Sequence, residues 1–317
     1  MKHFLSVKDV SDPEALVIEA LAYKKNPFRD RQLGSGKTLG MIFLNPSLRT
    51  RVSTQVAARN LGMEVVVFNI DKEGWQLEFA DGTVMDGSTT EHVKEAAAVL
   101  GQYFDILSIR TFPGLRDRDE DYNERVISQF VRYAGVPVVS LESATLHPLQ
   151  SLADLVTIRE LYGTERRPRV VLTWAPHVRA LPQAVPNSFV QWMRYWDKAD
   201  LVITHPEGYE LDERYAGNAI VETNQDKALE GADFVYVKNW SSVRHYGQIL
   251  SQDPSWMLTA EKLKVTNQAK VMHCLPVRRN LVIADDVLDS DSSVVVLQAG
   301  NRVWAAQAVL SEILRTL

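Results

Sequence analysis

The chain has 317 residues, of which 45% are hydrophobic and 24% charged, and its formal net charge is −5. This is the composition of a globular protein long enough for two domains, and the acidic charge argues against general nucleic-acid binding. No apolar run reaches the roughly eighteen residues of a membrane span, no secretion signal begins the chain, and a single cysteine permits no internal disulfide. We therefore expect a soluble cytoplasmic protein that binds neither nucleic acid nor membranes.

Short apolar runs alternate with helical patterns along the whole chain, and this predicts an α/β fold with parallel sheets. The predicted strands are 38–44, 64–69, 105–110, 136–140, 170–174, 200–204, 234–237 and 270–273. The predicted helices between them are 51–61, 91–103, 121–134, 183–196, 226–230 and 259–264. Residues 149–162 contain no Pro or Gly and predict a helix that joins two domains, and residues 302–317 predict a closing helix.

The segment Ser47–Arg51 follows an apolar strand pattern and precedes a helical one. Free N–H groups in the first turn of a helix and the helix dipole together favour an anion. Hydroxyls at Ser47 and Thr50 add donors, and the planar fork of Arg49 suits a phosphate. The alternative is an exposed helix cap with two solvated arginines, because a motif of five residues is weak evidence alone.

Two further motifs follow in the chain, His147-Pro148-Leu149-Gln150 and His273-Cys274-Leu275-Pro276. Together with Ser47–Arg51, and in this order, they resemble the three signatures of the aspartate and ornithine carbamoyltransferases over essentially the whole chain. The resemblance implies two doubly wound parallel-sheet domains joined by a bridging helix. It implies a carbamoyl-phosphate-binding domain over 1–147, completed by the C-terminal helix 302–317 that returns to it, and an acylornithine-binding domain over 148–301.

The resemblance also implies transfer of a carbamoyl group from carbamoyl phosphate to an amine, without a metal or cofactor. Arg110 stands at the end of an apolar strand pattern, where open parallel sheets bind ligands, and matches a family arginine at the phosphate and carbonyl. By the same match, His147 and Arg302 reach the carbonyl oxygen. The residues expected to hold carbamoyl phosphate are Ser47, Leu48, Arg49, Thr50, Trp75, Arg110, His147, Gln150, Cys274, Leu275 and Arg302.

The second substrate is indicated by a departure from the ornithine enzymes. Their Ser-Met-Gly loop is missing after Asp233, and Lys238 stands near its place. A lysine would repel a free α-ammonium but would suit a carboxylate of an N-acylated ornithine. Trp75 and the proline-rich stretch 174–183 resemble the acylornithine enzymes, which implies a homotrimer with Trp75 reaching a neighbour's site, and a backbone knot in the second domain. The residues expected at the acylornithine are Glu142, His177, Lys238, Cys274, Leu275, Arg278, Thr90 and Arg179.

The acyl group is succinyl or acetyl. In the family, glutamate at the position of Thr90 accompanies acetyl and proline accompanies succinyl, and Thr90 matches neither. A neutral Thr90 does not repel a second carboxylate, and Arg278 and Arg179 offer partners for it. The sequence therefore favours N-succinylornithine, with N-acetylornithine as the alternative. A more remote alternative is a catalytically silent, ligand-binding homologue, against which the complete set of site residues argues.

Overall fold

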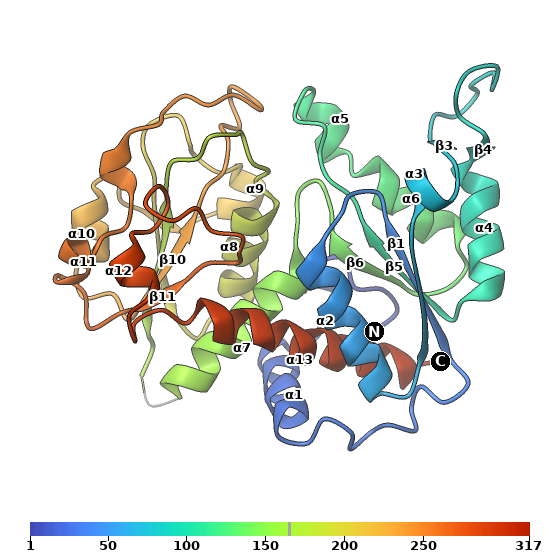
Figure 1. Ribbon diagram of the computed structural model, residues 1–317, viewed down its shortest axis with the longest axis horizontal. Helices are drawn as coiled ribbons and strands as arrows, with labels where there is room; N and C mark the ends of the chain where they lie inside the picture. The colour runs from blue at the N-terminus through green and yellow to red at the C-terminus, as the bar shows by residue number, and fades with distance from the viewer. Residues whose placement is uncertain (164–165) are drawn as a thin grey trace. The chain divides into compact units, whose positions relative to one another are not determined.

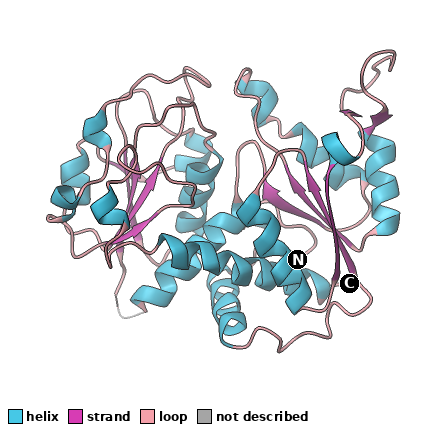
Figure 2. Ribbon diagram, viewed as in Figure 1, coloured by secondary structure: helices cyan, strands magenta, loops and turns pink. Residues whose placement is uncertain are grey.

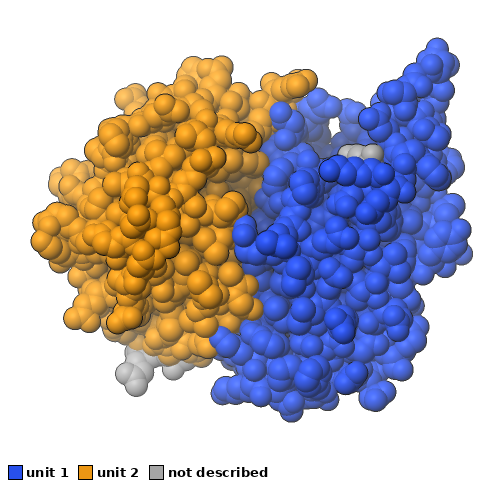
Figure 3. All heavy atoms as spheres, in the orientation of Figure 1, with its two compact units in different colours: residues 1–114, 119–149, 302–317 blue, residues 115–118, 150–301 orange. Residues whose placement is uncertain are grey.

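The computed structural model describes residues 1–163 and 166–317. They fall into two compact units, coloured separately in Figure 3. Unit 1 comprises residues 1–114, 119–149 and 302–317, and unit 2 comprises residues 115–118 and 150–301. The chain passes from one unit to the other within helices α7 (Pro148–Tyr162) and α13 (Val295–Leu314), and also on either side of residues 115–118. Within the described ranges, no helix has the length and apolarity needed to cross a bilayer.

Unit 1 is built on a parallel sheet of four strands in the order β2-β1-β5-β6. The strands are β1 (Thr38–Phe43), β2 (Glu64–Asn69), β5 (Ile106–Arg110) and β6 (Val138–Glu142). These confirm the predicted strands, with the fourth moved two residues along the chain. The two inner strands, β1 and β5, are buried on both faces, as is typical of parallel strands that helices cover on both sides.

The helices of unit 1 confirm the predicted alternation, with one error. They are α1 (Pro13–Lys25), α2 (Leu48–Asn60), α3 (Ile70–Glu73), α4 (Val93–Tyr103), α5 (Arg118–Tyr122), which begins in unit 2, and α6 (Arg125–Tyr133), with a short 3₁₀ turn η1 (Val7–Asp9). The single helix predicted over 121–134 is wrong, because Glu124 adopts a left-handed conformation at φ 50° and separates α5 from α6. Two short strands, β3 (Leu77–Glu78) and β4 (Glu91–His92), form a separate parallel pair beside α4.

Unit 2 repeats the plan with five parallel strands in the order β11-β10-β7-β8-β9. The strands are β7 (Arg169–Trp174), β8 (Asp200–Thr204), β9 (Ile220–Val221), β10 (Phe234–Lys238) and β11 (Lys270–Met272). The helical segments are α8 (Ala184–Trp196), α9 (Glu213–Ala216), α10 (Gln225–Leu229), η2 (Pro254–Trp256), α11 (Ala260–Leu263) and α12 (Asp285–Leu288). Figure 2 shows each sheet with helices around it.

The alternation of side chains along β10 divides the core of unit 2. Val235 and Val237 enter a cluster with the small and branched residues of α10, α12 and β11. Phe234 and Tyr236 face the other way, where Tyr236 packs edge-on against Phe189 of α8 with ring centroids 4.7 Å apart. A strand that is apolar on both faces in this way can only be stable between two layers of helices.

The order of strands locates the sites that each sheet can build. In unit 1 the chain moves from β1 to β2 on one side and later to β5 on the other, and in unit 2 from β7 to β8 and later to β10. The loops that leave β1 and β5, or β7 and β10, therefore diverge and open a crevice at the carboxyl ends of those strands. Ser47 and Arg110 stand at this edge in unit 1, and His177 and Lys238 in unit 2.

Candidate functional site

The loop after β1 ends in the N-terminus of α2. Ser47 is the N-cap, and its hydroxyl accepts a hydrogen bond from the Thr50 N–H at 3.3 Å. The side chain of Leu48 is 75% exposed, so the first turn is open to a ligand. Thr50 is buried, and its hydroxyl accepts from Nη2 of Arg302 at 2.5 Å. This hydrogen bond brings Arg302 to the first turn of α2, although Thr50 and Arg302 lie about 250 residues apart in sequence.

A β-bulge positions the charged residues at the ends of β5 and β6. Ile109 pairs with Ser140, but the register then shifts and Arg110 pairs with Glu142. Nη2 of Arg110 lies 2.9 Å from Oε2 of Glu142, and the same oxygen lies 3.4 Å from Nε2 of His147. All three side chains are less than 10% exposed. Glu142 therefore organises both the arginine and the histidine that the sequence places at the carbonyl.

Arg110 also supports the loop that precedes the anion site. Its Nη1 donates to the carbonyl oxygens of Asn45 and Pro46 at 2.9 and 2.7 Å, and its guanidinium lies 4.2 Å from the ring centroid of Phe112. Burial lowers the pKa of Arg110 below its ordinary value; Glu142 opposes this shift and the charge of Arg49 adds to it. The charge of Arg49 thus opposes that of Arg110, and a bound anion would offset this repulsion.

A residue that sequence reasoning missed holds the loop before His147. The carboxylate of Glu124 accepts hydrogen bonds from the hydroxyl of Ser143 at 2.6 Å, from the N–H of Ala144 at 3.3 Å and from the N–H of Thr145 at 2.8 Å. Its left-handed backbone turns the side chain into this loop. Nothing in the local sequence distinguishes Glu124 from the exposed acidic residues around it, so only the tertiary structure could identify it.

Gln150 lies in the first turn of α7, with less than 2% of its surface exposed. Asp154, one turn further on, accepts from its Nε2 at 2.8 Å and from Nε2 of Gln298 at 2.7 Å. The sequence analysis did not select Asp154 or Gln298. A signal was present, because Asp154 is four residues after Gln150 and Gln298 four before Arg302, and such residues share one helix face.

The motif His273–Pro276 forms a tight turn after β11. The ring Nδ1 of His273 accepts from the N–H of Leu275 at 2.9 Å, and the His273 N–H donates to Oε1 of Gln298 at 2.9 Å. Leu275 has φ 57° and is followed by a cis peptide bond to Pro276. Cys274 and Leu275 are partly exposed.

Unit 2 gathers basic residues around His177. Nε2 of His177 accepts from Nε of Arg278 at 3.2 Å, and its Nδ1 lies 3.0 Å from the carbonyl oxygen and 3.1 Å from the backbone nitrogen of Arg179. Burial lowers the pKa of His177; the hydrogen bond to Arg179 opposes this, and the charges of Lys238, Arg278 and Arg179 lower it further. The charges of three predicted site residues therefore act on one imidazole ring.

Trp75 and Thr90 lie just before the short strands β3 and β4. The indole N–H of Trp75 donates to Oε2 of Glu91 at 2.8 Å, and the N–H of Thr90 donates to the carbonyl oxygen of Gln76 at 3.0 Å. Half of the Trp75 side chain is exposed, and Thr90 is exposed as well. The structure thus brings these two predicted residues together beside the β3–β4 pair, which is separate from the four-stranded sheet of unit 1 (Figure 1).

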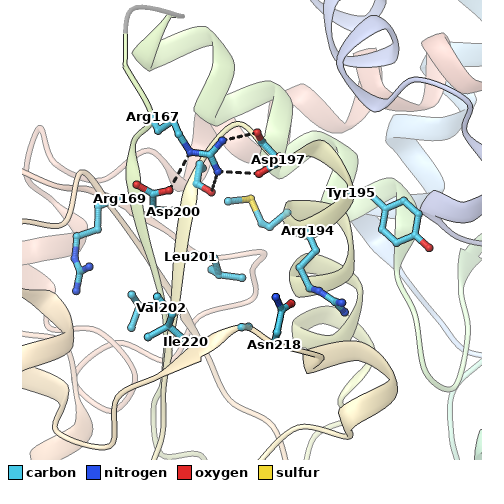
Figure 4. Close-up of a pocket in the computed structure, with 13 residues that line it drawn as sticks. Arg167, Arg169, Arg194, Tyr195, Asp197, Asp200, Leu201, Val202, Asn218 and Ile220 are labelled. Carbon is cyan, nitrogen blue, oxygen red and sulfur yellow. Dashed lines mark hydrogen bonds and ion pairs between the residues drawn. The ribbon is translucent and has the colours of Figure 1, made fainter.

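Asp233 is excluded from the substrate site by its position before β10. It lies at the amino end of the sheet, where its carboxylate accepts from Tyr162, Arg166 and Asn267. The open pocket of about 590 Å³ drawn in Figure 4 also lies at the amino ends of β7 and β8, and Arg167 beside it is paired with Asp197 and Asp200. Ligands of open α/β sheets bind at the opposite edge, so neither feature belongs to the candidate site.

The chain matches two family models in succession. Residues 2–160 match the carbamoyl-phosphate-binding domain of aspartate/ornithine carbamoyltransferase, and residues 184–313 match the Asp/Orn-binding domain of the same enzymes. The fold and these two matches therefore define a carbamoyltransferase. The chain belongs to the aspartate/ornithine carbamoyltransferase family, which confirms the resemblance drawn from its three motifs.

Relatives resemble the chain over its full length. N-succinylornithine carbamoyltransferase of Bacteroides fragilis (strain 638R) is 52% identical, with 100% of each chain covered. N-acetylornithine carbamoyltransferase of Xanthomonas campestris pv. campestris is 36% identical, with 98% of this chain and 97% of the relative covered. The crystal structure of acetylornithine transcarbamylase complexed with acetylcitrulline has a TM-score of 0.91 and 34% identity, covering 99% of both chains. A variant of that enzyme complexed with carbamyl phosphate and N-succinyl-L-norvaline also has a TM-score of 0.91.

Proposed function

We propose that this carbamoyltransferase transfers the carbamoyl group of carbamoyl phosphate to the side-chain amine of N2-succinyl-L-ornithine. The products are N-succinylcitrulline and phosphate, and the step belongs to arginine biosynthesis. The relatives with full-length similarity act on N-acylated ornithines by name, which supports this substrate class. In the reaction a C–N bond forms at the carbamoyl carbon, the C–O bond to phosphate breaks, and the amine loses a proton.

Carbamoyl phosphate is held by its phosphate at the N-terminus of α2. The N–H groups of the first turn, the hydroxyls of Ser47 and Thr50 and the guanidinium of Arg49 supply the donors. Phosphate is a better leaving group when its growing charge is neutralised, so the same contacts serve binding and catalysis. Residues 1–147 and 302–317 form the domain for this substrate, and residues 148–301 form the domain for the acylornithine.

The carbonyl oxygen is polarised by Arg110, His147 and Arg302. Negative charge develops on this oxygen as the amine attacks, and donors fixed before the reaction need no reorganisation. Glu142 and the bulge in β6 hold Arg110 and His147 in place. The carbamoyl NH₂ donates to acceptors, for which Oε1 of Gln150 and the carbonyls of Cys274 and Leu275 are assigned.

The single observation that carries the choice of succinyl is the basic cluster around His177. N2-Succinylornithine has two carboxylates, whereas N-acetylornithine has one. Lys238, Arg278 and Arg179 all act electrostatically on His177. We assign Lys238 to one carboxylate and Arg278 or Arg179 to the other, with Glu142 and His177 as further contacts and Thr90 facing the acyl group.

The test is citrulline-type product formation with carbamoyl phosphate and each of three amines, ornithine, N-acetylornithine and N-succinylornithine. We expect the highest kcat/KM for N-succinylornithine and the lowest for ornithine. A preference for N-acetylornithine would transfer the assignment to the alternative substrate. Absence of turnover with all three, together with retained carbamoyl phosphate binding, would support the catalytically silent homologue.

We further propose a homotrimer in which Trp75 reaches the carbamoyl phosphate of a neighbouring subunit. The half-exposed indole on an outlying strand pair supports this, because a large apolar side chain left exposed is suited to a partner surface. Light scattering of the purified protein measures the mass directly, and a monomer at micromolar concentration would exclude the shared site.

We also propose that unit 2 contains a backbone knot at the loop of residues 177–187. The N–H of Ser241 donates to the Leu181 carbonyl oxygen at 2.9 Å, and Nε2 of Gln183 donates to the Ser241 carbonyl oxygen at 2.6 Å, so this loop is tied to the segment after β10. Knots are very rare, so the proposal needs a direct test. Pulling both chain ends in an optical trap should leave an extended length shorter than that of an unknotted chain of 317 residues.

A further inference from the structure

Asp154 is a fully buried carboxylate in the second turn of α7. Its Oδ1 accepts two hydrogen bonds, from Nε2 of Gln150 at 2.8 Å and from Nε2 of Gln298 at 2.7 Å. Burying a carboxylate is unfavourable unless donors offset the loss of water, and these two amides do so. The carboxylate also affects a neighbouring residue. Burial raises the pKa of Tyr236, and the negative charge of Asp154 raises it further.

The direction of these hydrogen bonds is determined chemically. The backbone N–H of His273 can only donate, and it donates to Oε1 of Gln298 at 2.9 Å, so Nε2 of Gln298 must face Asp154. An ionised carboxylate can only accept, so Gln150 must also turn its Nε2 toward Asp154. The oxygen of the Gln150 amide is consequently turned away from Asp154.

That oxygen is an acceptor without a donor. Oε1 of Gln150 is buried and has no hydrogen-bond partner among the described residues, while the residue as a whole is 1% exposed. A buried amide oxygen in this condition favours a ligand that brings an N–H group. The carbamoyl group carries two such protons, whereas an inorganic phosphate dianion offers no N–H.

We propose that Asp154 is a positioning residue that fixes the Gln150 amide with its oxygen toward the carbamoyl NH₂ of carbamoyl phosphate. This inference rests on the proposed function. Without Asp154 the amide can rotate by half a turn and present its own NH₂ to the ligand, so that two donors face each other. The apparent affinity for carbamoyl phosphate then falls, because only a fraction of the protein molecules hold the Gln150 amide in the orientation that can bind.

The same carboxylate orders the turn after β11. Asp154 holds Gln298, and Gln298 holds the N–H of His273, which begins the motif carrying the Cys274 and Leu275 carbonyls. One buried carboxylate is therefore linked to all the acceptors assigned to the carbamoyl NH₂, and its hydrogen bonds with Gln150 and Gln298 do not involve the phosphate-binding residues Ser47, Arg49 and Thr50.

The test compares two ligands by calorimetry, carbamoyl phosphate and inorganic phosphate. Asp154→Ala should weaken carbamoyl phosphate binding about five- to tenfold, the value of roughly one hydrogen bond, and leave phosphate binding within about twofold. Asp154→Asn keeps an Oδ1 that can accept from both amides and should restore most of the affinity. Asp154→Ser should behave like Asp154→Ala, because a hydroxyl both donates and accepts and so does not select one orientation of the Gln150 amide. It replaces the alanine variant if that variant does not fold.

A double-mutant cycle separates positioning from a general structural effect. Asp154→Ala should cost clearly less in the Gln150→Ala background than it does alone, because the contact through Gln150 is already gone and only the effect through Gln298 remains. Thr157→Val is the matched control: it removes the buried 3.0 Å hydrogen bond from Asn301 on the same pair of helices, and should lower stability without changing either affinity.

Additive losses in the cycle, or equal losses for both ligands, would overturn the inference. Unchanged carbamoyl phosphate affinity in Asp154→Ala would do the same. These results differ from a failure of the proposed function, in which the unmodified protein itself would not bind carbamoyl phosphate or form product.

Discussion

Replacing Arg110 by alanine tests the centre of the site, and the structure predicts two separate effects. Arg110 makes three side-chain hydrogen bonds, to the carbonyl oxygens of Asn45 and Pro46 and to the carboxylate of Glu142. Its removal leaves Glu142 buried without this partner, and breaking a buried ion pair in this way costs about 3–5 kcal/mol. That is a large share of the roughly 5–15 kcal/mol that stabilises a domain.

The catalytic effect is expected to be independent of this loss. Removal of one donor to a developing oxyanion lowers kcat by about a hundred- to a thousandfold. The variant Arg110→Met/Glu142→Gln replaces the pair by neutral groups of similar size and should recover much of the lost stability. It should not recover turnover, because the positive charge at the carbonyl is still absent.

Two measurements distinguish these effects, urea unfolding for stability and product formation for kcat. Turnover within about tenfold of the unmodified protein in a folded Arg110→Ala protein would refute the catalytic role. Recovery of turnover in parallel with stability in the double variant would show that Arg110 acts only as a support for the loop and for Glu142.

Three further outcomes are expected. Thr90→Glu should shift the ratio of kcat/KM from N-succinylornithine toward N-acetylornithine by about tenfold or more, because a carboxylate at this exposed position repels the second carboxylate of the substrate; an unchanged ratio would contradict the acyl-group assignment. Trp75→Ala should weaken carbamoyl phosphate binding, and mixed oligomers with Arg49→Ala subunits should regain activity; lack of complementation in verified mixed trimers would exclude shared sites. Burial lowers the pKa of His177 below its ordinary 6.5, so the unfolded chain binds a proton at a higher pH than the folded protein does. The free energy of unfolding should therefore fall, relative to that of His177→Asn, as the pH drops through and below 6.5. Urea unfolding of both proteins measures this, and a difference in free energy that does not change with pH would contradict it.

The sequence alone determined the fold class and most of the elements, since apolar runs between helical patterns have few stable arrangements other than helix-covered parallel sheets. It also selected the residues at the ends of β1, β5, β7 and β10, because strand ends and helix N-termini are visible in a sequence. The split between α5 and α6 was not predictable, because a left-handed residue such as Glu124 has no signature when it is not glycine.

Only the tertiary structure decided which of these residues meet. Thr50 and Arg302 are joined across most of the chain, a bulge in β6 sets Glu142 against Arg110, and Asp154 gathers two glutamines from two helices. Such contacts depend on register and on packing between segments distant in sequence. The spacing of Asp154 from Gln150 places both on one helix face, but it does not show that Gln298 of another helix meets Asp154 there.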